Sequence, residues 1–121
     1  MNIIIVDDEQ IVRRIMSSYL SRFDFINIME ASSVEEIDTL LEINKPDLIF
    51  LDLSLKQKND GLEVLKKIKA RTPYVKVVIV SGDVHLNTVR KALALKADAY
   101  IKKPFSMKQI EKLIFKLGPR R

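Results

Sequence analysis

Residues 3–9 read Ile-Ile-Ile-Val-Asp-Asp-Glu, an apolar run that ends abruptly in three acids. The run is too short for a helix, and its unbroken β-branched character is typical of a strand buried on both faces of a sheet. Asp7 and Asp8 place two like charges at its end. Carboxylates about 5 Å apart repel by roughly 3 kcal/mol at an effective dielectric constant of about 20. We therefore expect a hard metal cation or a buried lysine beside them.

The composition is that of one globular domain. The 121 residues are 47% hydrophobic and 31% charged, a balance that supports a core and is not that of a disordered chain. We expect a single domain over residues 1–121, with 118–121 as a tail or the start of a linker. No run approaches the roughly 18 apolar residues of a membrane span. Because the chain shows no cysteine and no signal peptide, we expect a cytoplasmic location.

The basic character of the chain is a weaker signal. A net charge of +5 has the sign expected of nucleic-acid-binding proteins. The lysines and arginines are spread along the whole chain, however, which favours a solvated surface and no direct contact with nucleic acid. Lys108, Lys112 and Lys116 form one stripe at helical spacing, and here too a solvated face is favoured over a docking surface.

Short apolar runs alternate with segments of helical period along the chain. The patterns predict strands at 3–6, 25–29, 47–51, 75–80 and 99–101, and helices at 9–22, after a cap at Ser32 or Ser33, around Leu62 to Ile68, at 84–95 and at 106–117. Five strands alternating with five helices predict an α/β fold with a parallel sheet covered on both faces. The flavodoxin-like strand order 2-1-3-4-5 is the common arrangement at this length.

Polar residues stand where the apolar runs end. Asp7 and Asp8 follow the first strand, Asp52 the third, Ser81 the fourth and Lys103 the fifth. The carboxyl ends of parallel strands meet at one edge of the sheet, and ligands bind there beside the point where the strand order reverses. Three carboxylates at that edge suit Mg²⁺, and one of them beside a metal and a lysine is a suitable nucleophile toward a phosphoryl donor.

This set of residues resembles the receiver domain of two-component response regulators from Ile3 to Leu117. The matching positions are Asp7-Asp8, Asp52, Gly61, Ser81 and Lys103-Pro104. The resemblance implies that a sensor histidine kinase or phosphotransfer protein phosphorylates Asp52. It also implies Mg²⁺ ligation by Asp8, Asp52 and the backbone carbonyl of Ser54, with Asp7 acting directly or through water, and catalytic roles for Lys103 and Ser81.

The resemblance further implies a switch. Ser81 would swing toward the phosphoryl group and Tyr100 would turn inward with it. The motion would remodel the face formed by the fourth helix, fifth strand and fifth helix, where relatives bind an effector domain or protein, or a second copy of the chain. The Lys103-Pro104 bond, often cis in relatives, would hold the ammonium toward the site. Such a protein catalyses only its own phosphorylation and dephosphorylation and is not a turnover enzyme.

Three positions depart from the family pattern. Lys56 stands where the family usually has proline, and the loop to Gly61 is one residue longer. Lys96 stands where glycine often ends the fourth helix; a left-handed backbone there would cost a lysine roughly 1 kcal/mol, partly offset by its charge at a helix C-terminus. Ser81 replaces the commoner threonine but keeps the hydroxyl.

Other interpretations of the same residues stay open at this point. Asp7 and Asp8 by themselves fit a helix N-terminus, and His85 fits a solvated position in the first turn of its helix. A haloacid-dehalogenase-like phosphotransferase also uses a strand-ending aspartate and Mg²⁺, but Asp52-Leu53-Ser54 lacks that family's second acid. A docking module that works without phosphorylation is the third alternative, and it leaves the retained pocket residues unexplained.

Overall fold

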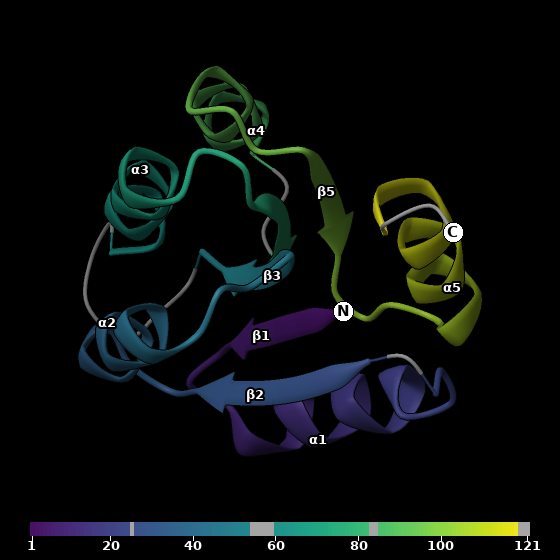
Figure 1. Cartoon of the computed structure of the whole chain (residues 1–121). Coiled ribbons are helices and arrows are strands. Elements are labelled where there is room, and N and C mark those ends of the chain that lie inside the picture. The colour runs from purple at the N-terminus through teal and green to yellow at the C-terminus, as the bar shows by residue number, and fades with distance from the viewer. Residues whose placement is uncertain (25, 54–59, 83–84, 119–121) are drawn as a thin grey trace.

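The computed structural model describes residues 1–24, 26–53, 60–82 and 85–118. Strands and helices alternate along this chain and form three layers, with the sheet in the middle (Figure 1). The elements are β1 (Asn2–Val6), α1 (Gln10–Leu20), β2 (Asn27–Ala31), α2 (Val34–Ile43), β3 (Leu48–Asp52), α3 (Asp60–Arg71), β4 (Lys76–Ser81), α4 (Leu86–Ala94), β5 (Ala99–Lys102) and α5 (Met107–Leu117).

The sheet has the order β2-β1-β3-β4-β5, with every neighbouring pair parallel. The predicted flavodoxin-like topology is therefore confirmed. The register sets β1, β3 and β4 to end at nearly the same level, because Val6 is opposite Leu51 and Asp52 is opposite Val80. The residues that follow these strands consequently share one edge of the sheet.

Alternate residues of the central strands feed two separate cores. Ile4, Val6 and Ile49 lie in the core beneath α2, α3 and α4, whereas Ile3 and Ile5 lie in the core beneath α1 and α5. All five are almost fully buried. A strand covered on both faces needs apolar side chains at every position, which explains why the run at 3–6 does not alternate with polar residues.

The second strand differs from its prediction by two residues. It spans Asn27–Ala31 instead of 25–29, because it pairs with the whole of β1, from Asn2 opposite Asn27 to Val6 opposite Ala31. Phe23 and Ile26 are apolar for another reason: they pack against the core beneath α1 and α5. Phe25 lies outside the described residues.

The helix ends agree with the predicted caps in part. Ser33 is the N-cap of α2, and its side chain accepts a hydrogen bond from the Glu36 N–H. Lys96 has a φ of 74°, so the expected left-handed backbone after α4 is confirmed. His85 is exposed at the N-cap position of α4, one residue before the helix, rather than in its first turn. Lys108, Lys112 and Lys116 are exposed along α5.

Among the described helices, none combines the length and the apolar character that crossing a membrane requires.

Candidate functional site

Three polar side chains are buried where the central strands end. Asp7 follows β1, Asp52 ends β3 and Ser81 ends β4, and each is only 2% exposed. The strands end at nearly the same level because of their common register, which brings the three side chains to one edge of the sheet. Buried carboxylates require partners of opposite charge, so the neighbours of Asp7 and Asp52 determine what this site can do.

Lys103 supplies the positive charge. Its Nζ lies 2.8 Å from Asp7 Oδ2, 3.5 Å from Asp52 Oδ2 and 3.6 Å from Glu9 Oε1. Burial of the ammonium acts to lower the Lys103 pKa, but the hydrogen bond that it donates to Asp7 and the charges of Asp52, Asp7 and Glu9 outweigh this effect and raise the pKa above its ordinary value. The lysine follows β5, and its peptide bond to Pro104 is cis, as the resemblance implied.

The acids also form a cluster that fits a hard cation. Asp7, Asp8 and Asp52 each offer one carboxylate oxygen, and these oxygens all lie within 4.8 Å of one another. Neighbouring oxygen ligands on one Mg²⁺ lie about 3 Å apart, so the carboxylates would have to close around the ion. Both Asp7 oxygens already accept hydrogen bonds, Oδ1 from the Glu9 N–H at 2.9 Å and Oδ2 from Lys103. Asp8 and Asp52 are therefore better placed to contact a cation directly.

The structure brings together the candidate residues that end the first, third, fourth and fifth strands. Ser54, whose carbonyl was predicted to be a metal ligand, lies outside the described residues, as does Lys56. Ser81 is tied to the lysine's segment, because its carbonyl accepts a hydrogen bond from the Lys103 N–H at 2.8 Å. Tyr100 is partly buried and packs against the core beneath α2, α3 and α4.

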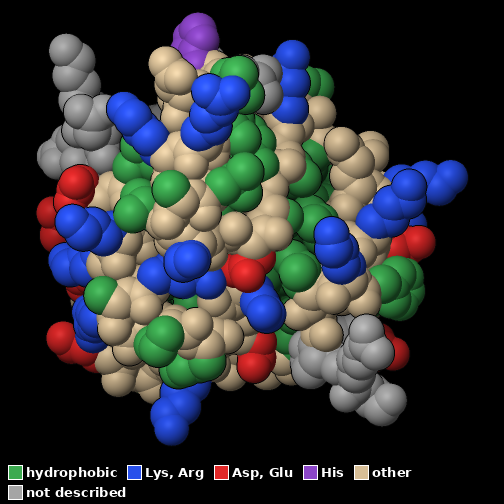
Figure 2. Space-filling model, turned by 90° about the horizontal axis from the view of Figure 1, so that it is seen from above, with side chains coloured by type: hydrophobic (Ala, Val, Ile, Leu, Met, Phe, Trp, Pro, Cys, Tyr) green, Lys and Arg blue, Asp and Glu red, His purple; other side chains and the backbone are tan. Residues whose placement is uncertain are grey.

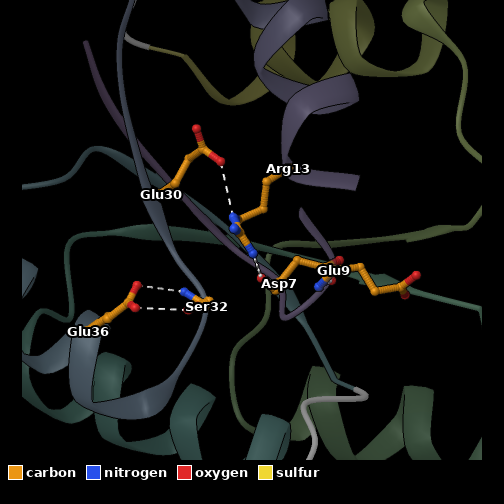
Figure 3. Close-up of polar contacts among 6 residues, drawn as sticks. All are labelled: Asp7, Glu9, Arg13, Glu30, Ser32 and Glu36. Atoms are coloured by element: carbon orange, nitrogen blue, oxygen red, sulfur yellow. Dashed lines mark hydrogen bonds and ion pairs between the residues drawn. The ribbon is translucent and has the colours of Figure 1, made fainter. Parts of the chain in front are cut away.

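Sequence reasoning missed two residues of the site. Glu9 approaches Lys103, as described above, and Arg13 reaches from α1 to the backbone of Asp7. Figure 3 shows the Arg13 guanidinium between Glu30 and Asp7: Nε lies 3.1 Å from Glu30 Oε1, and Nη1 donates to the Asp7 carbonyl at 2.7 Å. The available signal was spacing, since residue 13 is one helical turn after Glu9 and so faces the same way.

Comparison with protein families gives the same answer as the geometry. The family model for the response regulator receiver domain matches residues 3–115. The chain belongs to this family. This is the family that the residues at the strand ends resemble. The match covers nearly the whole of the described fold.

Relatives of the receiver domain are longer proteins. The transcriptional regulatory protein MalR of Bacillus subtilis is 32% identical over 111 residues, which are 91% of this chain and 47% of MalR. The response regulator protein VraR of Staphylococcus aureus (strain Mu3) is 37% identical over 109 residues, 89% of this chain and 52% of VraR. The chain therefore spans about half the length of these relatives.

Solved structures agree with the fold. The signal receiver domain of a DNA-binding response regulator from Colwellia psychrerythraea 34H superposes with a TM-score of 0.90 at 26% identity, covering 97% of each chain. A CheY-like receiver domain protein from Methanospirillum hungatei JF-1 superposes with a TM-score of 0.86 at 29% identity, covering 96% of this chain and 92% of that one.

Proposed function

We propose that the receiver domain is a phosphorylated signalling switch in which Asp52 is the phosphoacceptor. The single observation that carries the proposal is the juxtaposition of the buried Asp52 carboxylate, the other two acids of the cluster and the Lys103 ammonium. A sensor histidine kinase or a phosphotransfer protein would be the phosphoryl donor, and the cytoplasm would be the location. The domain would catalyse only its own phosphorylation and dephosphorylation.

The reaction begins with attack by an Asp52 carboxylate oxygen on the phosphorus of a phosphohistidine. The new O–P bond forms as the P–N bond breaks, and the imidazole nitrogen leaves with the electron pair of that bond. Hydrolysis would restore the unphosphorylated protein: water attacks the phosphorus, the Asp52 carboxylate leaves, and inorganic phosphate is released. Burial of Asp52 beside Lys103 supports the transfer step, because bulk water does not compete with the phosphoryl donor for the carboxylate.

Mg²⁺ is the cofactor that the acidic cluster fits. Asp8 and Asp52, with the Ser54 carbonyl, would hold it directly, and Asp7 would act directly or through water. When bound, the metal supplies positive charge next to the transferring phosphoryl group. The engagement of both Asp7 oxygens supports an arrangement in which Asp7 mainly orients Lys103.

Lys103 and Ser81 would complete the site. The Lys103 ammonium lies between Asp7 and Asp52, where it would neutralise charge on a phosphoryl oxygen. Ser81 ends the neighbouring strand with its side chain buried, and its hydroxyl would donate a hydrogen bond to another phosphoryl oxygen. Tyr100, two strand positions before Lys102, would turn inward as Ser81 moves.

The output would be read from the face formed by α4, β5 and α5. Leu86 and Leu93 on α4 are 60% and 51% exposed. Figure 2, which looks down on α4, shows hydrophobic side chains gathered between lysine and arginine side chains. An effector domain, an effector protein or a second copy of the chain would bind there, with no role for membrane or direct nucleic-acid contact in this domain.

Incubation with acetyl phosphate and Mg²⁺ tests the proposal. Intact-mass spectrometry should show one added phosphoryl group on the wild type and none on Asp52→Asn. Asp47→Asn is the matched control, because Asp47 lies at the opposite end of β3, where its carboxylate accepts a hydrogen bond from the Asn2 N–H. Labelling of Asp52→Asn as strong as that of Asp47→Asn would refute the assignment, and steady phosphate release from monoesters would favour the phosphotransferase alternative.

A further inference from the structure

We propose that Arg13 is a positioning residue for the acidic cluster and that it raises the affinity of the site for Mg²⁺. The inference rests on the metal site of the proposed function. It concerns a residue that touches neither the metal nor the phosphoryl group, and it follows from three contacts in the described structure. The first fixes the Asp7 backbone, the second fixes Arg13 itself, and the third closes the turn that carries Asp8.

The backbone of Asp7 is held from two elements. Its N–H donates to the Ala31 carbonyl at 3.1 Å, at the end of β2, and its carbonyl accepts from Arg13 Nη1 at 2.7 Å, on α1. The Asp7 side chain then accepts from the Glu9 N–H, which closes the turn over residues 7–9. A backbone bonded in this way on both sides has little freedom to rotate.

Arg13 is itself held in one orientation. Its Nε lies 3.1 Å from Glu30 Oε1, and its side chain is 15% exposed, against 42% for Glu30. The guanidinium is a rigid fork whose donors point in fixed directions. With one donor on Glu30 and another on the Asp7 carbonyl (Figure 3), it links α1, β2 and the end of β1. Charge-assisted hydrogen bonds of this kind are roughly twice as strong as neutral ones.

The contact from Arg13 fixes the orientation of Asp8. The Asp7 carbonyl and the Asp8 N–H belong to the same planar peptide group, so the bond from Arg13 fixes the plane from which the Asp8 side chain departs. Among the described residues, the Asp8 side chain has no hydrogen bond or ion pair of its own. Its direction toward the Asp52 carboxylate therefore depends on the backbone, and the backbone depends on Arg13.

The positive charge of Arg13 allows a positioning role to be distinguished from a purely electrostatic one. A cation near the cluster opposes Mg²⁺ binding by Coulomb repulsion, so removing it should tighten binding if charge were its only effect. Removing a positioning contact should weaken binding, because the metal would then have to order Asp8 itself. The two accounts predict changes of opposite sign.

Calorimetric titration of the full chain with Mg²⁺ tests this. Arg13→Met removes the donors but keeps the packing of the aliphatic stem, and we expect its Kd to rise about 10-fold. Arg14→Met is the matched control, because it removes the same charge from the next, exposed position of α1. We expect its Kd to be unchanged or slightly lower. Arg13→Lys keeps the positive charge but cannot donate to Glu30 and to the Asp7 carbonyl at once, so its Kd should also rise above the wild-type value.

A merely structural role is excluded by two further readouts. A loss of global stability lowers the melting temperature but leaves the Kd of the folded molecules unchanged. In the metal-free protein, the NMR resonance of the Asp8 amide should shift in Arg13→Met and not in Arg14→Met, because the neighbouring carbonyl loses its donor.

The outcomes separate the two levels of the argument. Equal Mg²⁺ affinities of Arg13→Met and Arg14→Met would overturn the role of Arg13 and leave the metal site standing. If Arg13→Met does not fold, Arg13→Lys decides: affinity equal to wild type contradicts the inference. Absence of saturable Mg²⁺ binding by the wild type would overturn the proposed metal site and this inference with it.

Discussion

Gly61 offers the most direct test of how the fold positions the strand that carries Asp52. It lies in the first turn of α3, against the residue that follows Asp52. A Cβ added at Gly61 would lie 2.6 Å from the Leu53 carbonyl oxygen and 2.8 Å from its carbonyl carbon, and would also overlap Leu53 Cα. Ordinary contacts between such atoms are about 3.5 Å long. Because the obstacle is backbone, Gly61→Ala must push α3 and the end of β3 apart by about 1 Å.

The cost can be worked from two opposing effects. Forcing extra atoms into a packed region costs about 1–3 kcal/mol, and a rigid backbone neighbour places this case at the upper end. Alanine in a helix gains about 1 kcal/mol over glycine. The net loss is then about 2 kcal/mol. Unfolding entropy for 121 residues is about 0.25 kcal/mol per degree, so the melting temperature should fall by about 8 °C.

Gly82→Ala is the control for this experiment. Gly82 follows β4 at the same edge of the sheet, and a Cβ there would meet no atom of the described residues within 4 Å. Urea unfolding should show a loss of about 2 kcal/mol for Gly61→Ala and no loss for Gly82→Ala. Acetyl phosphate labelling well below the melting temperature should also slow for Gly61→Ala, because Leu53 adjoins Asp52. Equal stabilities of the two variants would refute the packing argument.

Three other perturbations address the site and the helix ends. Mg²⁺ at 100 times its Kd should stabilise the wild type by about 2.7 kcal/mol. Asp52→Asn should be more stable than the wild type without metal, and Mg²⁺ should raise its stability less. An unchanged melting temperature of the wild type in millimolar Mg²⁺ would contradict the metal assignment. The Glu36 carboxylate accepts hydrogen bonds from the backbone and hydroxyl of Ser32, which lower its pKa. A lowered pKa contributes stability above the unfolded pKa that is lost as pH falls through the folded value, so Glu36→Gln should cost about 0.5 kcal/mol at neutral pH and nothing in strong acid. A deficit that persisted in acid would assign the effect to packing instead. Lys96→Gly should relieve the left-handed lysine and stabilise the chain by about 1 kcal/mol, measured by urea unfolding; destabilisation would mean that the lysine charge at the end of α4 outweighs the strain.

The topology was predictable from the sequence because its main signals are local. A run such as Ile3–Val6, apolar at every position, has one physical meaning at this length: a strand covered on both faces. Once five strands alternate with helices, the handedness of the crossover connections leaves few arrangements. Asp7, Asp52 and Lys103 then fall at one edge without any knowledge of distances.

The features that could not be predicted depend on contacts between residues far apart in the sequence or on the backbone. The start of β2 was placed at residue 25 because Phe-Ile-Asn-Ile-Met over residues 25–29 alternates like a strand, but Ile26 lies before β2 and packs against the core beneath α1 and α5. Only pairing with β1 sets the true boundary at Asn27. Arg13 was missed because its role is a bond to a backbone carbonyl, and a carbonyl leaves no mark in the sequence.

The charge balance of the site resolves the problem that the acids at residues 7–9 raise. The clustered carboxylates of Asp7, Asp8 and Asp52 carry three negative charges, and the Lys103 ammonium, in contact with two of them, removes one. The remaining two match one divalent cation. Lys103 thus lowers the repulsion among the acids, yet leaves the charge that a metal would bind. Phosphorylation would replace the single negative charge of Asp52 by nearly two. Lys103 and Mg²⁺ together would not cancel this additional negative charge. It would draw the Ser81 hydroxyl toward the phosphoryl group and start the change at the α4, β5 and α5 face.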